Sequence, residues 1–219
     1  MIIIKNDRDL DIMRPACAVA SAVLNEVCAF IQPGVTTQEI DQFAAARMKH
    51  YGAKSAFLGY RKFPCHTCIS VNEEVVHGMA STRQLCFGDI VSLDVGVVFN
   101  GFIGDTARTV AVGGCGVLAQ RLMDITEKAL YEGIAQAVPG NRVADISGAI
   151  QKYVEDNGFS VVREFVGHGV LFENCFCSDT KPGECTQKAQ ARGPTFPRIR
   201  NGSCLHLVKR SANYCNLSH

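Results

Sequence analysis

Two stretches of the sequence match each other when one is shifted by 106 residues. The shift places Pro33-Gly34 on Pro139-Gly140, Glu39-Ile40 on Asp145-Ile146 and Gly52 on Gly158, with no gaps. A match at a fixed spacing indicates that a structural unit has been duplicated. In the first copy, a pair of predicted helices precedes a region with the composition of a sheet. The sequence therefore predicts a duplicated α/β (α+β) fold.

Four helices and two strand regions are expected. Apolar residues recur at steps of three or four between Asp7 and Ile31, and they form one stripe that comprises Ile12, Ala16, Val19, Val23, Val27 and Phe30. Thr36-x-x-Glu39 is a capping box for a second helix that ends at Gly52. Its inward residues are expected to be Ile40, Phe43, Ala44, Met48 and Tyr51. Further helices are expected at 117–137 and 143–157, and strands within 66–71 and 89–112.

Charge is distributed unevenly along the chain. Residues 1–170 carry 15 Lys and Arg against 18 Asp and Glu, whereas residues 171–219 carry 7 against 3 and hold 5 of the 11 cysteines. We therefore expect two kinds of sequence joined near Val170. The net charge of +1 argues against a nucleic-acid site. No apolar run approaches the ~20 residues of a membrane span, and the first residues lack a signal-peptide core. A cytoplasmic location with reduced cysteines is expected.

Asn100-Gly101 separates two β-like runs and is a typical two-residue hairpin loop, because a type I′ turn requires positive φ at both positions. If the strands pair directly across this loop, Asp94 lies opposite Ala107, and Asp105 points to the same face as Asp94. Such diagonal neighbours lie ~7–8 Å apart at the backbone, so the carboxylates can share one cation or a pair ~3.5–4 Å apart. The simpler interpretation is two solvent-exposed aspartates near a turn. However, Asp is disfavoured inside strands, and Asp94 stands in a Val-rich run.

Two histidines stand beside glycines at the ends of β-like runs, His168 in Gly167-His168-Gly169 and His77 before Gly78. An imidazole together with carboxylates suits Zn, Mn, Fe or Co better than Ca or Mg. A lone histidine is more often a structural residue than a ligand, so this assignment depends on the nearby carboxylates.

The cysteines offer two further metal or redox interpretations, and both are disfavoured. Cys65-His66-Thr67-Cys68 has the spacing of a redox or zinc pair. A redox pair requires a helix N-terminus to lower a thiol pKa, whereas the residues that follow have the composition of a strand. The cysteines of the tail and His206 do not have the spacing of a compact zinc site.

Five stretches of the chain match one known family. They are Ser55–Tyr60, Cys68–Asn72, Val75–Gly78, Asp94 with Asp105 in Gly104-Asp105-Thr106, and Phe165–Gly169. On these residues, 1–170 resembles a type I methionine aminopeptidase of the short bacterial kind, a metallopeptidase of family M24. The resemblance implies the pita-bread (creatinase/aminopeptidase-like) fold with its second half truncated. It divides the chain into an incomplete pita-bread domain, 1–170, and a non-homologous tail, 171–219, that is expected to be disordered or frameshifted.

The resemblance implies a role for each site residue. Asp94 would be a bidentate ligand of one metal ion, Asp105 would bridge two metal ions, and His168 would bind the second through a ring nitrogen. The implied cofactor is two divalent metal ions, either Co, Mn, Fe or Zn. His77 would contact the substrate near the scissile amide and help to stabilise the transition state. The pocket for the methionine side chain would be lined by Phe57, Tyr60, Phe63 and Cys68, with Phe57 and Phe63 standing where relatives often carry Cys and Tyr.

The match ends after Val170. The family continues with a Gly, a His-Glu pair and two separated metal-binding glutamates, whereas this tail contains only Glu173 and Glu184, and neither lies in a family-like context. Three of the five expected metal ligands are therefore present, while the second substrate histidine and the glutamate proton shuttle are missing. We hypothesise that the tail is a frameshifted or mis-spliced reading of the gene.

The function that the resemblance implies is metal-dependent removal of the N-terminal methionine from nascent proteins, with this chain inactive or impaired. One alternative is a non-catalytic pita-bread module that binds a peptide or a partner. Another is a proline-specific peptidase, which the His77 segment and the Tyr60 run disfavour. The expected partners are nascent chains that begin with Met and, as a further expectation, the ribosome. A monomer with no membrane contact and no specific nucleic-acid site is expected.

Overall fold

The computed structural model describes residues 5–163, 169 and 215–216 of the 219. These residues belong to two compact units, one within 5–115 and the other within 116–169 together with 215–216.

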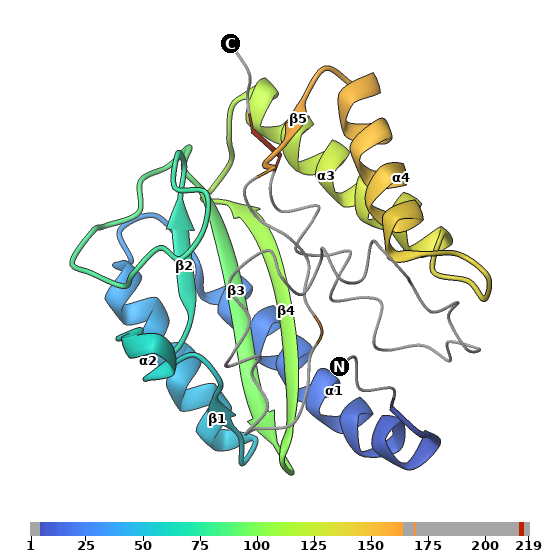
Figure 1. Cartoon of the computed structure of the whole chain (residues 1–219). Helices are drawn as coiled ribbons and strands as arrows, with labels where there is room; N and C mark the ends of the chain where they lie inside the picture. Colours follow the sequence, from blue (N-terminus) through green and yellow to red (C-terminus); the bar gives the residue numbers. More distant parts are fainter. Residues whose placement is uncertain (1–4, 164–168, 170–214, 217–219) are drawn as a thin grey trace. The chain divides into compact units, whose positions relative to one another are not determined.

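The first unit consists of two helices packed on an antiparallel sheet, as Figure 1 shows. Helix α1 spans Asp7–Phe30 and helix α2 spans Thr37–His50. The strands are β1 (Lys54–Ser55), β2 (Cys68–Val71), β3 (Ile90–Phe99) and β4 (Phe102–Ala111), and a short 3-10 helix, η1 (Tyr60–Lys62), precedes β2. Strand β3 is central, because β4 pairs along one of its edges while β1 and β2 pair along the other. Each predicted helix and strand region of this unit is present, within two residues at nearly every end.

The hairpin of β3 and β4 turns at the loop that the sequence predicts. Phe99 pairs with Phe102, and the loop residues Asn100 and Gly101 have φ values of 51° and 79°. Positive φ at both central residues is the requirement of a type I′ turn, whose twist matches that of the flanking strands. This turn fixes the pairing register of all ten residues in each strand.

One face of β3 forms the centre of the core. Its alternate residues Val91, Leu93, Val95 and Val97 are fully buried and pack against Ala20, Val23, Leu24 and Val27 of α1 and Ile40, Ala44 and Met48 of α2. The predicted stripe of α1 is correct at its centre. Ile12, Val19 and Phe30 are only partly buried, however, and the buried face also includes Met13, Ala20 and Leu24. This face stabilises the unit by about 1.5–3 kcal/mol for each large apolar side chain removed from water.

The second unit repeats the first at the predicted spacing. Helix α3 spans Val117–Ala135, helix α4 spans Val143–Asp156, and strand β5 (Ser160–Val161) pairs with β6 (Cys215–Asn216). Both ends of α4 and both ends of β5 lie 106 residues after those of α2 and β1. The buried residues of α4 are Ile146, Ile150 and Val154, which correspond to Ile40, Ala44 and Met48. The predicted duplication is therefore confirmed over the helix pair and the strand that follows it.

Helix α1 also bears on the expectation that the chain has no membrane span. By length and composition alone, it is the one helix among the described residues that is apolar enough to cross a membrane. Ala20, Val23, Leu24 and Val27 pack against the β3 face and α2, and Met13 and Ala16 pack against the cluster of Phe57 and Phe102, so α1 is amphipathic as a core helix is.

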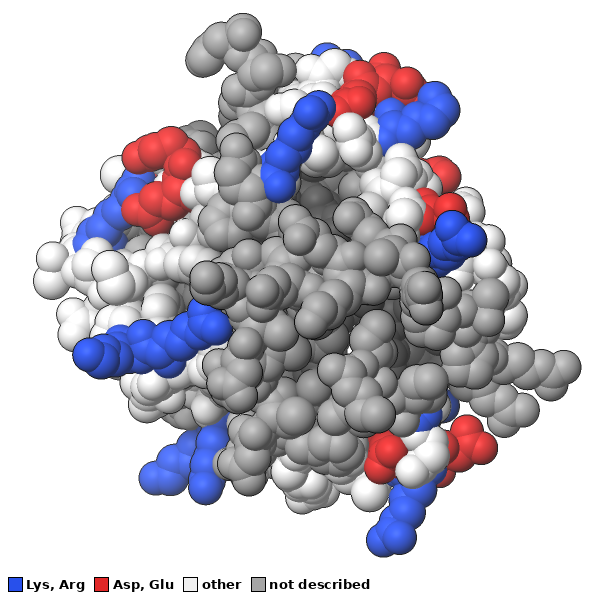
Figure 2. Space-filling view, viewed as in Figure 1, with Lys and Arg blue, Asp and Glu red and all other residues white. Residues whose placement is uncertain are grey.

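Figure 2 shows side chains of both charge signs on the described part of one face.

Candidate functional site

The two predicted carboxylates share one face of the β3–β4 hairpin. Asp94 lies opposite Ala107, and Asp105 lies opposite Gly96. Because paired residues and every second residue of a strand point to the same side, Asp94 and Asp105 are diagonal neighbours, with backbones ~7–8 Å apart. Their face is opposite to the one that α1 and α2 cover. The geometric part of the sequence prediction is therefore confirmed.

Both carboxylates are partly withdrawn from water. Asp94 and Asp105 are half-buried, and the Oδ1 atom of each is shielded from solvent. Two like charges at this separation repel each other, and a cation between them would offset the repulsion. Carboxylate oxygens are suitable ligands for divalent metal ions, so the donor chemistry of this face fits a metal site. Among the described residues, no group of three His, Cys, Asp or Glu side chains is close enough to hold a metal. The third predicted ligand, His168, lies outside the described residues.

Three of the four predicted pocket residues meet in one apolar cluster. Phe57, Cys68 and partly buried Phe63 pack together with Phe102 and Ile103. Cys68 belongs to β2, which pairs with the edge of β3 that β4 does not occupy. It lies directly opposite Asp94, so its thiol points to the carboxylate face. The ring of Phe57 also lies on this face, since it occupies the space that a side chain at Gly96 would need. An apolar wall thus borders the two carboxylates.

The fourth predicted pocket residue, Tyr60, lies in the turn that shapes this wall. Its backbone N–H donates to Phe57 O (2.9 Å), and its carbonyl accepts from Phe63 N (2.8 Å). Tyr60 itself is half-buried and is not a member of the apolar cluster. The Ser55 hydroxyl stabilises the start of this turn, because it accepts a hydrogen bond from the backbone N–H of Phe57 (3.1 Å).

His77 lies in the connection between β2 and β3, beside the outer edge of β2. It is exposed and has a positive φ of 59°. The next residue, Gly78, accepts a hydrogen bond from Ile69 N (3.0 Å) and donates one to Ser70 Oγ (3.1 Å). A Cβ atom at Gly78 would overlap the carbonyl oxygen of Ile69, so only glycine permits this approach. Because Ser70 is two residues from Cys68 on the carboxylate face, the His77–Gly78 peptide lies on that side of β2.

Sequence reasoning did not identify Asp41, whose side chain organises the start of β2. Asp41 is buried within α2. Its Oδ1 atom accepts from His66 N (2.9 Å), Thr67 N (2.8 Å) and Thr67 Oγ1 (2.8 Å). A signal was available, because Asp41 stands three residues before Ala44 and seven before Met48, and so lies on the inward stripe of the helix.

The structure argues against a redox role for Cys65 and Cys68. Both side chains are buried, and Cys68 begins a strand rather than a helix. Burial is the main cause that raises the pKa of the Cys65 thiol. A raised pKa favours the unreactive thiol over the thiolate.

Acidification is expected to weaken the hydrogen bonds that Asp89 accepts at the end of the connection between β2 and β3, which carries His77. The pKa of Asp89 is lowered, first by the hydrogen bond from Cys86 N and then by that from the Asn72 side chain. A lowered pKa stabilises the folded state above the ordinary value of 3.8, and this contribution is lost as pH falls through the folded-state pKa. The stability difference between wild type and Asp89→Asn should therefore shrink below about pH 4. Urea unfolding of both proteins from about pH 6 to about pH 2.5 tests this; a constant difference would contradict it.

Comparisons with known proteins show the family of this chain. The model of "Metallopeptidase family M24" matches residues 11–191. A methionine aminopeptidase of Clostridium perfringens is 47% identical over 170 residues, which cover 78% of this chain and 68% of the relative. Methionine aminopeptidase 1 of Bacillus subtilis shows the same identity and coverage.

Solved structures give the same result. The methionine aminopeptidase of Rickettsia prowazekii superposes with a TM-score of 0.77 at 36% identity and covers 78% of this chain and 70% of its own. That of Thermotoga maritima has a TM-score of 0.75 at 40% identity, with coverages of 78% and 69%. The prolidase of Pyrococcus furiosus has a TM-score of 0.69 at 25% identity and covers 77% and 49%. The expected pita-bread fold is thus confirmed, and the higher identities favour the methionine enzymes over the proline-specific ones. The chain belongs to metallopeptidase family M24 and, within it, to the methionine aminopeptidases.

Proposed function

We propose that this chain binds the N-terminal methionine of peptides beside a divalent metal site on the β3–β4 hairpin. The observation that carries the proposal is the shared face of Asp94 and Asp105, bordered by the Phe57 ring. In this proposal Asp94 would hold one ion, Asp105 would hold both ions, and His168 would hold the second. The ions are Co, Mn, Fe or Zn. When bound, such ions activate water and polarise a carbonyl.

The protein residues then have separate tasks. Phe57, Phe63 and Cys68, with Tyr60, receive the methionine side chain, since an apolar wall favours removal of its thioether from water. His77 donates or accepts a hydrogen bond at the scissile amide. Asp94 and Asp105 fix the ions relative to this pocket, so that binding of the side chain sets the position of the first peptide bond.

We further propose that turnover by this chain is impaired. The tail 171–219 provides neither a His-Glu pair nor two glutamates in the family context, so the second substrate histidine and the proton shuttle would be missing. In this proposal, 1–170 is an incomplete pita-bread domain and 171–219 is a frameshifted or mis-spliced tail. Reading the gene in its other two frames after codon 170 tests the origin of the tail. The proposal fails if neither frame encodes a His-Glu pair and two later glutamates.

The proposed setting follows from the proposed substrate. A new N-terminal methionine is exposed as a chain leaves the ribosome, so we place the protein in the cytoplasm, as a monomer that acts near the ribosome. Sedimentation with ribosomes at physiological salt, compared with gel filtration of the free protein, tests both parts of this setting.

Metal binding by the full chain tests the site directly. With Mn²⁺ at 100 times its dissociation constant, wild type should gain ~2.7 kcal/mol, a rise of ~5–10 °C in Tm for a chain of this size. Asp105→Asn should lose this rise, because an amide is a weaker ligand than a carboxylate. Asp124→Asn, an exposed position on α3, is the matched control and should retain it. Equal stabilisation of Asp105→Asn and wild type would refute the metal site.

Release of methionine from Met-Ala-Ser with added Mn²⁺ or Co²⁺ then separates the enzyme from the binding module. The incomplete ligand set favours a non-catalytic peptide-binding module as the second candidate. Metal-dependent stabilisation without methionine release would support that candidate. Turnover equal to that of an intact relative, and lost in Asp105→Asn, would contradict the proposed impairment.

A further inference from the structure

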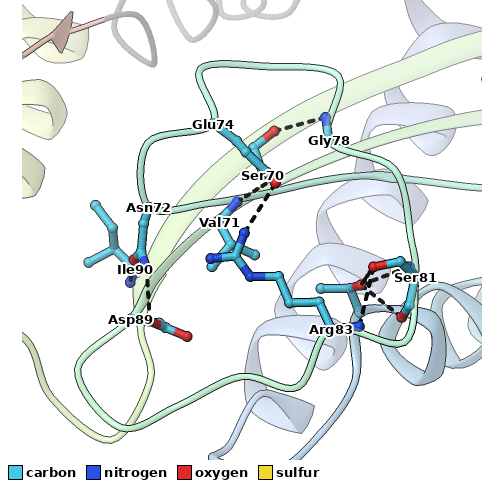
Figure 3. A network of polar contacts seen from close by, with 10 residues as sticks. Ser70, Val71, Asn72, Glu74, Gly78, Ser81, Arg83, Asp89 and Ile90 are labelled. Carbon is cyan, nitrogen blue, oxygen red and sulfur yellow. Dashed lines mark hydrogen bonds and ion pairs between the residues drawn. The ribbon is translucent and has the colours of Figure 1, made fainter.

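The connection between β2 and β3 is a long loop held at several points. We call residues 72–89 the His77 loop. Most of its length has no regular secondary structure, so side-chain and backbone hydrogen bonds must define its path. Figure 3 shows these bonds together.

The base of the His77 loop is closed by Asn72 and Asp89. The Asn72 side chain donates to Asp89 Oδ1 (2.8 Å) and accepts from Ile90 N (2.9 Å). The Asn72 backbone N–H donates to Ile90 O (2.9 Å). Asp89 Oδ2 accepts in addition from Cys86 N (2.8 Å). The two ends of the loop are thereby tied to each other at the ends of β2 and β3, as Figure 3 shows.

The middle of the His77 loop is stabilised by contacts between its own two sides and by contacts with α2. Glu74 accepts from Val71 N (2.9 Å) and forms an ion pair with Arg83 (3.2 Å). The carbonyl of Arg83 accepts from Thr37 N (3.0 Å), and the Ser81 carbonyl accepts from the Thr37 hydroxyl (3.0 Å). These bonds restrain the loop on both sides of His77, but none of them involves a residue directly beside it.

Two hydrogen bonds restrain Gly78, directly beside His77. Ile69 N donates to the Gly78 carbonyl (3.0 Å), and Gly78 N donates to Ser70 Oγ (3.1 Å), the latter visible in Figure 3. Ser70 is 3% exposed, so its hydroxyl is held by the packing of β2. It pairs with Ser92, two residues along from the Cys68–Asp94 pair, and it therefore also points to the carboxylate face. A non-glycine residue keeps a positive φ only where its surroundings enforce it, and His77 does so at 59°. The Ser70 bond restrains the peptide that leaves His77.

We propose that the Ser70 hydroxyl is a positioning group that fixes the backbone of His77, and thereby its imidazole, relative to the carboxylate face. The proposal rests on the proposed function only for the role of His77 toward substrate. Ser70 itself touches neither substrate nor metal in this proposal. It acts by holding Gly78, and the Asn72–Asp89 base and the Glu74–Arg83 pair keep the loop close enough for that bond to form.

The test uses the full chain without metal, and its readout is the imidazole proton resonance of His77, assigned by its loss in His77→Gln. In Ser70→Ala this resonance should shift toward the position of an unstructured histidine, with the Ile69 N–Gly78 O bond still in place. In Ser70→Thr, which keeps a hydroxyl, it should remain at its wild-type position. Ser92→Ala is the matched control, because that hydroxyl lies in the same row and hydrogen-bonds with Thr109 at 2.8 Å; it should leave His77 unchanged. An unchanged His77 resonance in Ser70→Ala, or an equal change in Ser92→Ala, would overturn the proposal.

A second measurement needs no variant that might fail to fold. In wild type, the Gly78 amide should exchange with solvent more slowly than in an unstructured chain, by the ~2- to 10-fold that one net hydrogen bond provides. Exchange at the unstructured rate would overturn the proposal. Neither measurement requires metal or turnover. A failure of the metal test at Asp105 with a positive result here would therefore reject the proposed function and keep the positioning role of Ser70.

Discussion

Gly104→Ala is expected to destabilise the first unit by about 3 kcal/mol, the upper part of the usual range for overpacking. A Cβ atom at Gly104 would overlap the carbonyl group of Ala16 and lie 2.9 Å from the backbone nitrogen of Cys17. These are atoms of the α1 backbone, which no change of side-chain rotamer can move. Helix α1 would have to shift away from β4 and open the core beneath it.

The same substitution at Gly148 is the control for this prediction. Gly148 is exposed within α4, and a Cβ there would contact nothing within 4 Å. Gly148→Ala should therefore stabilise its helix by about 1 kcal/mol, because alanine has the higher helix propensity. Urea unfolding followed by far-ultraviolet circular dichroism measures both variants. An unchanged unfolding midpoint for Gly104→Ala would show that α1 lies farther from β4 than the structure has it.

Asp41→Ala is expected to cost about 3–5 kcal/mol of stability, as is usual when a buried polar network is broken. The substitution removes the acceptor of two backbone N–H groups and of the Thr67 hydroxyl, and Thr67 is fully buried. Each buried donor left without an acceptor costs about 1–3 kcal/mol. The loss should be concentrated at the start of β2, next to Cys68.

Asp41→Asn separates the hydrogen bonds from the charge. The amide oxygen of Asn can still accept from Thr67 N and its hydroxyl, so this variant should lose only about 1–2 kcal/mol, the difference between charged and neutral acceptors. Urea unfolding at neutral pH measures both variants. Equal losses in Asp41→Ala and Asp41→Asn would mean that the carboxylate charge, rather than the acceptor geometry, holds β2.

The sequence predicted the parts of the fold that depend on local rules. The register of the hairpin follows from one turn, and the turn follows from Asn100-Gly101. The boundaries of α2 follow from the Thr36–Glu39 capping box and from Gly52, and the repeat transfers the same boundaries to α4. The shared face of Asp94 and Asp105 needed nothing beyond the parity of a β-strand.

The parts that the sequence did not predict depend on contacts between distant segments. Asp41 meets Thr67, 26 residues away, and the Phe57 ring reaches Gly96 across the sheet. The buried face of α1 was shifted by part of a turn, since Met13, Ala20 and Leu24 are buried while Ile12 and Val19 are only partly so. Apolar residues surround most of this helix, and only the sheet beneath it selects the side that is buried. His168 was predicted as a ligand and lies outside the described residues.

The shared face of Asp94 and Asp105 depends on the register between β3 and β4. The two residues are eleven positions apart, an odd number that would put them on opposite faces of a single straight strand. The two-residue loop restores them to the same face. One inserted residue between Phe102 and Asp105 would turn Asp105 toward α1, into the apolar core. Two inserted residues would keep the face but displace the carboxylate by ~7 Å along the strand. A deletion or insertion of one residue within β4, between Phe102 and Asp105, is therefore equivalent to a mutation of Asp105 itself.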